Sequence, residues 1–167
     1  MQALVVDGYN VMHASPRYLD IADRDIDAAR AVIVNDIAAY AHDQFEAIVV
    51  FDGATNPYSD GTPHEVAGVQ VIFSPWGRDA DGVIEQEIAR RRAQGQQVVL
   101  VTSDAQTQWV GLGLDALRVS SAQFVERLTA SAEEDRGFLP AGSPGATLDA
   151  RIDPATRDAL AKWARGL

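Results

Sequence analysis

The chain alternates between short, fully apolar runs and longer segments in which apolar residues recur every three or four positions. The short runs are typical of strands covered on both faces, and the longer segments are typical of helices with one buried face. Strands are predicted at Ala3–Val6, Ala47–Phe51, Val69–Phe73, Gln97–Val101 and Ala116–Val119, and helices at Ile26–His42, Asp79–Gln94 and Ser121–Arg136. Because strands and helices alternate, the pattern predicts an α/β fold with a central, mostly parallel sheet and helices on both faces.

Gly, Pro and small polar residues mark the breaks between these elements. Residues 53–68 are rich in them and are predicted to be mainly loop, and residues 137–150 are predicted to form a Pro/Gly-rich linker. We therefore expect one domain over residues 1–136, followed by a C-terminal helix within residues 151–167 that packs on the domain or extends it. Asp153–Pro154 suits the cap and the first turn of that helix.

Composition and charge narrow the possible functions of these 167 residues. The absence of cysteine excludes a disulfide scaffold, a thiolate metal site and a cysteine nucleophile. The formal net charge of -10 argues against a broad basic surface that wraps nucleic acid, but it is compatible with a small acidic site that works through bound cations. The sequence shows neither a signal-like leader nor an apolar run of roughly 20 residues, so we expect a cytoplasmic protein with no membrane partner.

Aspartates follow three of the predicted strands: Asp7 and Asp52 come directly after theirs, and Asp104 comes three residues after Val101. The carboxyl ends of parallel strands meet at one edge of a sheet, where open α/β proteins also bind their ligands. Asp81 lies in the first turn of the helix after the third strand and is expected at the same edge, and Asn10 follows Asp7 by three residues. We therefore predict that these oxygen-bearing side chains converge.

Converging carboxylates repel one another unless a cation lies between them. Hard divalent ions such as Mg²⁺ or Mn²⁺ prefer oxygen ligands and commonly bridge protein carboxylates to substrate phosphates. The pattern therefore favours phosphodiester hydrolysis by metal-activated water, which needs neither a serine nucleophile nor a catalytic histidine. Glu85 follows Asp81 by four residues on the same helix face and is a further candidate, for which a solvated surface position is the simpler interpretation.

Each of these acidic residues also has a purely structural interpretation. Asp and Asn favour turns at strand ends, and Asp79 or Asp81 suits the cap of the helix that follows. From the residues alone, the structural role and the metal site are both open. Two other enzyme classes are disfavoured: Gly8 is a single glycine where a dinucleotide-binding turn needs several, and Tyr9 stands where a haloacid-dehalogenase-like phosphatase needs a second acid.

Five segments together resemble the YacP-like branch of NYN domains, which are relatives of PIN-domain nucleases. In chain order they read LVVDGYNVMHA, VVFDG, ADGVIE, VTSDAQTQW and ALRVSSAQFVERL. The resemblance implies a PIN-like fold, a three-layer α/β/α sandwich with a central, mostly parallel sheet. It implies that the catalytic, metal-binding acids are Asp7, Asp81 and Asp104. It also implies that Asn10 and Asp52 support this site.

The resemblance further implies a metal-dependent endoribonuclease that takes part in mRNA decay on the translating ribosome. Mg²⁺ or Mn²⁺ would be its cofactor, and RNA, with the ribosome, its partner. We expect Arg78, beside the acidic turn, and Ser103, before Asp104, to contact the RNA. The alternative is a non-catalytic adaptor that binds RNA or ribosomes with the same fold; the acidic set argues against it, because a binding module has no need for mutually repelling carboxylates.

Overall fold

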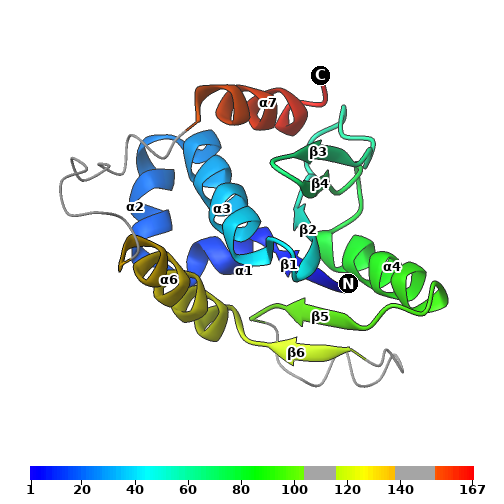
Figure 1. Cartoon of the computed structure of the whole chain (residues 1–167). Helices are drawn as coiled ribbons and strands as arrows, with labels where there is room; N and C mark the ends of the chain where they lie inside the picture. The colour runs from blue at the N-terminus through cyan, green and yellow to red at the C-terminus, as the bar shows by residue number, and fades with distance from the viewer. Residues whose placement is uncertain (104–115, 138–152) are drawn as a thin grey trace.

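Six strands form one central sheet in the part of the chain that the computed structural model describes, residues 1–103, 116–137 and 153–167. Their spatial order is β3-β4-β2-β1-β5-β6 (Figure 1), and neighbouring strands run parallel except for the antiparallel pair β3 and β4. The bounds are β1 Gln2–Asp7, β2 Phe45–Phe51, β3 His64–Val66, β4 Val69–Phe73, β5 Val98–Val101 and β6 Leu117–Val119. The five predicted strands are therefore present, and β3 is an addition within the mainly irregular residues 53–68.

Six helices accompany the sheet within the described residues. They are α1 Gly8–His13, α2 Pro16–Arg24, α3 Ile26–Ala41, α4 Ala80–Ala93, α6 Ser121–Gly137 and α7 Pro154–Ala164. None of these helices has both the length and the apolar character that crossing a membrane requires.

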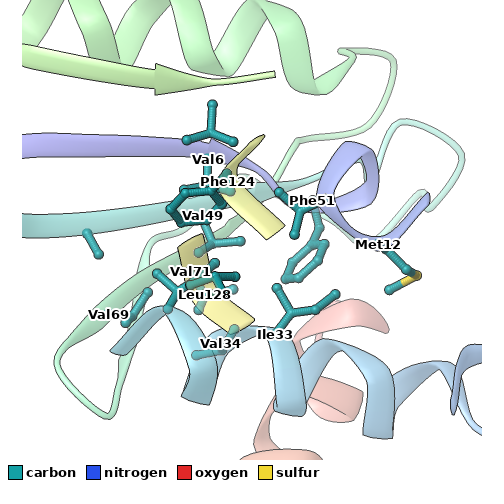
Figure 2. Packing of buried hydrophobic residues seen from close by; sticks show 14 of the residues in the cluster. Val6, Met12, Ile33, Val34, Val49, Phe51, Val69, Val71, Phe124 and Leu128 are labelled. Carbon is teal, nitrogen blue, oxygen red and sulfur yellow. The ribbon is translucent and has the colours of Figure 1, made fainter. Parts of the chain in front are cut away.

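Alternating side chains of the strands form two separate cores, one on each face of the sheet. On β1, Leu4 and Val6 belong to the core that includes α1, α3 and α6, whereas Ala3 and Val5 belong to the core under α4. Figure 2 shows the first core, in which Val6, Val49 and Val71 of neighbouring strands lie beside residues of α3 and α6. The predicted three-layer α/β/α sandwich is therefore confirmed, with most of the described helices on one face.

Helices α1 and α2 were not predicted from the sequence. The Asp7 carboxylate accepts the backbone N–H of Asn10 at 3.2 Å and caps α1, so a helix begins where the pattern suggested only a turn. The Ser15 hydroxyl caps α2 in the same way, and Pro16 occupies its first position. These helices have six and nine residues, which is too short for a clear apolar period.

Helix α7 packs against the first core. Asp153 caps it and Pro154 stands in its first turn, as predicted. Leu160 is fully buried, and the Trp163 ring stacks on His64 of β3 with 4.4 Å between ring centroids. The predicted linker lies outside the described residues except for Gly137, where α6 ends.

Candidate active site

An open cavity of about 250 Å³ lies at the carboxyl edge of the sheet. Among the described residues, its lining consists of Asp7, Tyr9, Asn10, Asp52, Asp79, Ala80, Asp81 and Ser103. It therefore brings together the ends of β1 and β2, the first turns of α1 and α4, and the segment that follows β5. Five residues named from the sequence (Asp7, Asn10, Asp52, Asp81 and Ser103) meet in this one cavity.

Asp7 occupies the middle of this edge. It is the last residue of β1, which lies between β2 and β5, and its backbone pairs with Val50. Only 8% of the residue is exposed, and its carboxylate accepts the Asn10 N–H as the cap of α1. The strand and the helix together fix the direction of this carboxylate, so capping is part of how the site is built.

Asn10 connects the two strands at the middle of the site. Its side-chain nitrogen donates a hydrogen bond to the Thr102 hydroxyl at 3.0 Å, and Thr102 directly follows β5. Thr102 is 5% exposed, so this bond lies in a protected position. The bond holds the amide of Asn10 beside Asp7 and brings Ser103, the next residue, to the same cavity.

The remaining carboxylates approach from the other side of the cavity. Asp52, which follows β2, accepts the N–H of Ala54 at 2.8 Å in a local turn. Asp79 caps α4 by accepting the N–H of Gly82 at 2.9 Å, and Asp81 belongs to the first turn of that helix. The structural interpretation therefore holds for the individual contacts of Asp52 and Asp79, and both side chains nevertheless line the shared cavity.

Three other candidates lie elsewhere. The Arg78 guanidinium contacts Gln86 at 3.5 Å and the carbonyl of Gly82 at 3.4 Å, and Arg78 is absent from the described lining of the cavity. Glu85 is half-buried on α4 and is likewise absent from that lining. Asp104 lies outside the described residues.

Sequence reasoning missed the contributions of Tyr9, Asp79 and Ala80 to the lining. In the sequence, Tyr9 stands out only because it occupies the position where a haloacid-dehalogenase-like phosphatase needs its second acid. Asp79 stands out only as a candidate helix cap. A signal was available for both, because Tyr9 lies between Asp7 and Asn10, and Asp79 lies two residues before Asp81.

The donor set of the cavity suits a hard divalent cation. Its potential ligands are carboxylate, amide and hydroxyl oxygens, and no Lys, Arg or His occurs among the described residues that line it. Within residues 1–103, 116–137 and 153–167, no three His, Asp or Glu side chains are close enough together to hold one ion. The chemistry of the donors therefore fits a metal ion, and protein ligation from the described residues would involve fewer than three such side chains.

Comparison with known proteins agrees with the fold. The model of the YacP-like NYN domain family matches residues 4–165. Over 131 residues the chain is 31% identical to "Uncharacterized protein YacP" of Bacillus subtilis strain 168, covering 77% of this chain and 75% of that protein.

Two crystal structures described as Rae1 (YacP) from Bacillus subtilis have the same fold. One of them, a mutant in which a leucine replaces a tryptophan, superposes with a TM-score of 0.66 at 26% identity, covering 96% of this chain and 98% of the other. The second structure gives a TM-score of 0.61 at 28% identity, covering 99% of this chain and 96% of the other. The chain belongs to the YacP-like NYN domain family, within the PIN-like nuclease superfamily.

Proposed function

We propose that this chain is a metal-dependent endoribonuclease, which hydrolyses phosphodiester bonds within RNA by means of water activated by Mg²⁺ or Mn²⁺. The observation that supports the proposal most directly is the cavity at the carboxyl edge of the sheet. Four aspartates line it together with Asn10 and Ser103. Membership of a nuclease-type family supports the same class of reaction.

In the proposed site, Asp7, Asp81 and Asp104 hold the ion. A bound Mg²⁺ or Mn²⁺ supplies a Lewis acid for the phosphate oxygens and lowers the pKa of bound water. Asp7 suits a ligand role because β1 and the N–H of Asn10 fix its carboxylate. Asp52 and Asp79 add negative charge to the same cavity and thereby favour retention of a cation.

The polar residues of the cavity orient the RNA. Asn10 is held by its hydrogen bond to Thr102, so little side-chain entropy is lost when its amide contacts the substrate. The Ser103 hydroxyl can donate a hydrogen bond to a phosphate oxygen. Arg78 lies outside the described lining. Its contact with the RNA stays a prediction, and would be made with a phosphate of the RNA backbone outside the cavity.

The cellular context of the proposal follows from the family resemblance. We extend it to mRNA that is being translated, so that the ribosome presents the substrate and the reaction takes place in the cytoplasm. The net charge of -10 is consistent with a need for such presentation, because the chain as a whole does not attract free RNA.

The test is a cleavage assay on 5′-labelled RNA, with and without ribosomes, during titration of Mg²⁺ or Mn²⁺. Wild type is compared with Asp7→Asn and Asp104→Asn, with Asp25→Asn as a control that changes a helix cap outside the described lining of the cavity. We expect metal-dependent cutting by wild type and by Asp25→Asn, and a loss of about 100-fold or more in the other two variants. Cutting that occurs only when ribosomes are added would support the proposal that the ribosome presents the RNA to the enzyme.

Two outcomes would contradict the proposal. Cutting that persists after chelation of divalent ions would exclude metal-dependent hydrolysis. Binding of RNA or ribosomes by wild type and Asp7→Asn alike, with no cutting by either, would identify a non-catalytic adaptor.

A further inference from the structure

We propose that Tyr9 contacts the RNA substrate in the cavity and that Arg30 is a positioning residue, which acts by holding Tyr9 in place. The inference rests on the proposed function of the site. It adds an aromatic contact to a cavity whose other candidate residues are carboxylates, an amide and a hydroxyl.

Tyr9 lies between Asp7 and Asn10 in the chain and lines the same cavity. Tyr9 is half-buried, and its ring packs on Phe51, with 5.2 Å between the ring centroids and 54° between the ring planes. Phe51 is fully buried, so it gives Tyr9 a rigid support. Proteins that bind single-stranded RNA commonly stack bases or riboses on aromatic rings of this kind.

Arg30 of α3 holds the other end of Tyr9. Its Nε and Nη2 atoms donate hydrogen bonds to the Tyr9 hydroxyl oxygen at 3.2 and 2.5 Å. The same guanidinium lies 5.6 Å from the centroid of the Tyr9 ring and 5.4 Å from that of the Phe73 ring. A planar guanidinium that donates twice to one oxygen fixes that oxygen more closely than a single donor does.

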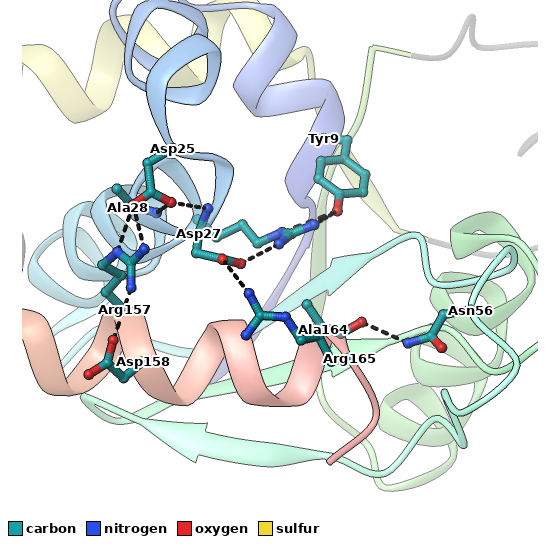
Figure 3. A network of polar contacts seen from close by, with 10 residues as sticks. Tyr9, Asp25, Asp27, Ala28, Asn56, Arg157, Asp158, Ala164 and Arg165 are labelled. Atoms are coloured by element: carbon teal, nitrogen blue, oxygen red, sulfur yellow. Dashed lines mark hydrogen bonds and ion pairs between the residues drawn. The ribbon is translucent and has the colours of Figure 1, made fainter.

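Arg30 is itself held by an ion pair. Its Nη1 atom pairs with Asp27 at 2.7 Å, and only 11% of the Arg30 side chain is exposed. Asp27 also lies 3.6 Å from the Arg165 guanidinium at the end of α7 (Figure 3). A continuous series of contacts therefore runs from the C-terminal helix through Asp27 and Arg30 to a residue that lines the cavity.

The two hydrogen bonds of Arg30 to Tyr9 satisfy N–H donors of a guanidinium that is mostly buried. They also restrict a residue that lines the cavity, where restriction lowers the entropic cost of binding a flexible substrate.

The test measures kcat and KM for RNA cleavage in Tyr9→Ala, Tyr9→Phe, Arg30→Gln and the double variant Tyr9→Ala/Arg30→Gln. We expect Tyr9→Ala to raise KM roughly tenfold or more while kcat changes less, because stacking stabilises bound RNA. Arg30→Gln should raise KM by a smaller factor in the wild-type background and not at all in the Tyr9→Ala background. Tyr9→Phe, which keeps the ring and loses the anchored hydroxyl, should resemble Arg30→Gln.

Tyr18→Phe is the matched control. Tyr18 is a buried tyrosine whose hydroxyl donates to Asp36 at 2.7 Å, and it is absent from the described lining of the cavity. Melting temperatures of all variants show how much of each protein is folded, and KM is compared for the folded fraction. KM should be unchanged in Tyr18→Phe.

The outcomes separate this inference from the proposed function. If wild type cuts RNA and Tyr9→Ala keeps its KM, the inference fails and the proposed function stands. If the effects of Tyr9→Ala and Arg30→Gln on KM add in full, Arg30 does not act through Tyr9. If wild type binds RNA without cutting it, the proposed function fails, and the Kd values of the same variants then decide the inference. Wild type that neither binds nor cuts RNA, alone or with ribosomes, overturns both.

Discussion

Two groups of aspartates in this protein, most of which lie at helix N-termini, differ in the side chains that surround them. In the first group, Asp25 caps α3 and Asp27 lies in its first turn. Asp25 forms an ion pair with Arg157 at 2.6 Å, and Asp27 forms ion pairs with Arg30 at 2.7 Å and Arg165 at 3.6 Å. These carboxylates are neutralised by the protein itself, and they connect α3 to α7.

The second group lines the cavity at the carboxyl edge of the sheet. Asp7 caps α1, Asp79 caps α4, Asp81 lies in the first turn of α4, and Asp52 follows β2. No arginine or lysine occurs among the described residues of this lining. The comparison shows that capping alone does not distinguish the two groups. Several carboxylates gathered in one cavity whose described lining contains no basic residue give that cavity a negative field that suits a cation.

The largest expected effect comes from exchanging one aspartate of each group for asparagine. Asp7→Asn should lower the rate of RNA cleavage by about 100-fold or more, because it removes a charge from the proposed metal site. Asparagine caps helices as well as aspartate does, so the variant should stay folded. Asp25→Asn keeps its cap for the same reason and should cleave RNA at the wild-type rate. Equal rates in the two variants would remove the functional distinction between the groups.

The second effect concerns the framework that places the cavity carboxylates. A methyl group on Gly8, the first residue of α1, would overlap the ring of the fully buried Phe51. Gly8→Ala should therefore lower the free energy of unfolding by about 1–3 kcal/mol. On Gly82, in the first turn of α4, the nearest atoms would be 3.5 Å away, which is ordinary contact.

Gly82→Ala is thus the matched control for Gly8→Ala. Alanine has the higher helix propensity, so this variant should be neutral or more stable by up to about 1 kcal/mol. Urea unfolding monitored by circular dichroism measures both variants. A Gly8→Ala protein as stable as wild type would show that Phe51 can move, and that the packing beneath Asp7 is less rigid than the structure indicates.

The main elements of the fold could be predicted because their sequence signals are long or simple. Apolar runs located β1, β2, β4 and β5, and the helical period located α3 and α4. The short helices α1 and α2 and the three-residue strand β3 were missed, because a few residues contain no complete apolar period and their starts depend on single caps. Tertiary packing determines such short elements.

For the candidate site, the sequence predicted which strand ends come together, but it did not predict the directions of the side chains. The rule that parallel strands end at one edge was sufficient to bring Asp7 and Asp52 to one cavity. It did not determine that Arg78 lies against α4, since no period fixes the direction of a side chain in a loop. The contact of Arg30 with Tyr9 joins residues 21 positions apart and has no local signature.

The third effect is stabilisation of the fold by a metal ion. At a free Mg²⁺ or Mn²⁺ concentration tenfold above its Kd, binding should stabilise wild type by about 1.4 kcal/mol, which corresponds to roughly 3–6 °C in Tm for a chain of this size. Asp25→Asn should show the same shift, and Asp7→Asn should show little or none. Differential scanning calorimetry with and without the ion measures the shift. An equal shift in Asp7→Asn would place the ion outside the cavity.

The smallest effect is the acid dependence of the first group. Partial burial raises the pKa of Asp25, but the hydrogen bond from Arg157, the N–H groups of Ala28 and Asp27 and the charge of Arg157 together bring that pKa below its ordinary value of 3.8. A carboxyl with a lowered folded-state pKa stabilises the fold fully above 3.8, and this stabilisation is lost as the pH falls through the folded pKa. Arg157→Gln should therefore lower Tm at pH 6, and the difference from wild type should shrink below pH 3.8.

The exposed pair Arg24 and Asp20 supplies the control for this measurement. Its side chains are 79% and 70% exposed, so Arg24→Gln should leave Tm unchanged at every pH. The Arg157→Gln difference should also decrease in high salt, because about a third of each side chain in that pair is exposed to solvent. A difference that stays constant from pH 6 to pH 2 would mean that Arg157 stabilises α7 by packing rather than by its charge. The first group would then differ from the cavity in location and not in electrostatics.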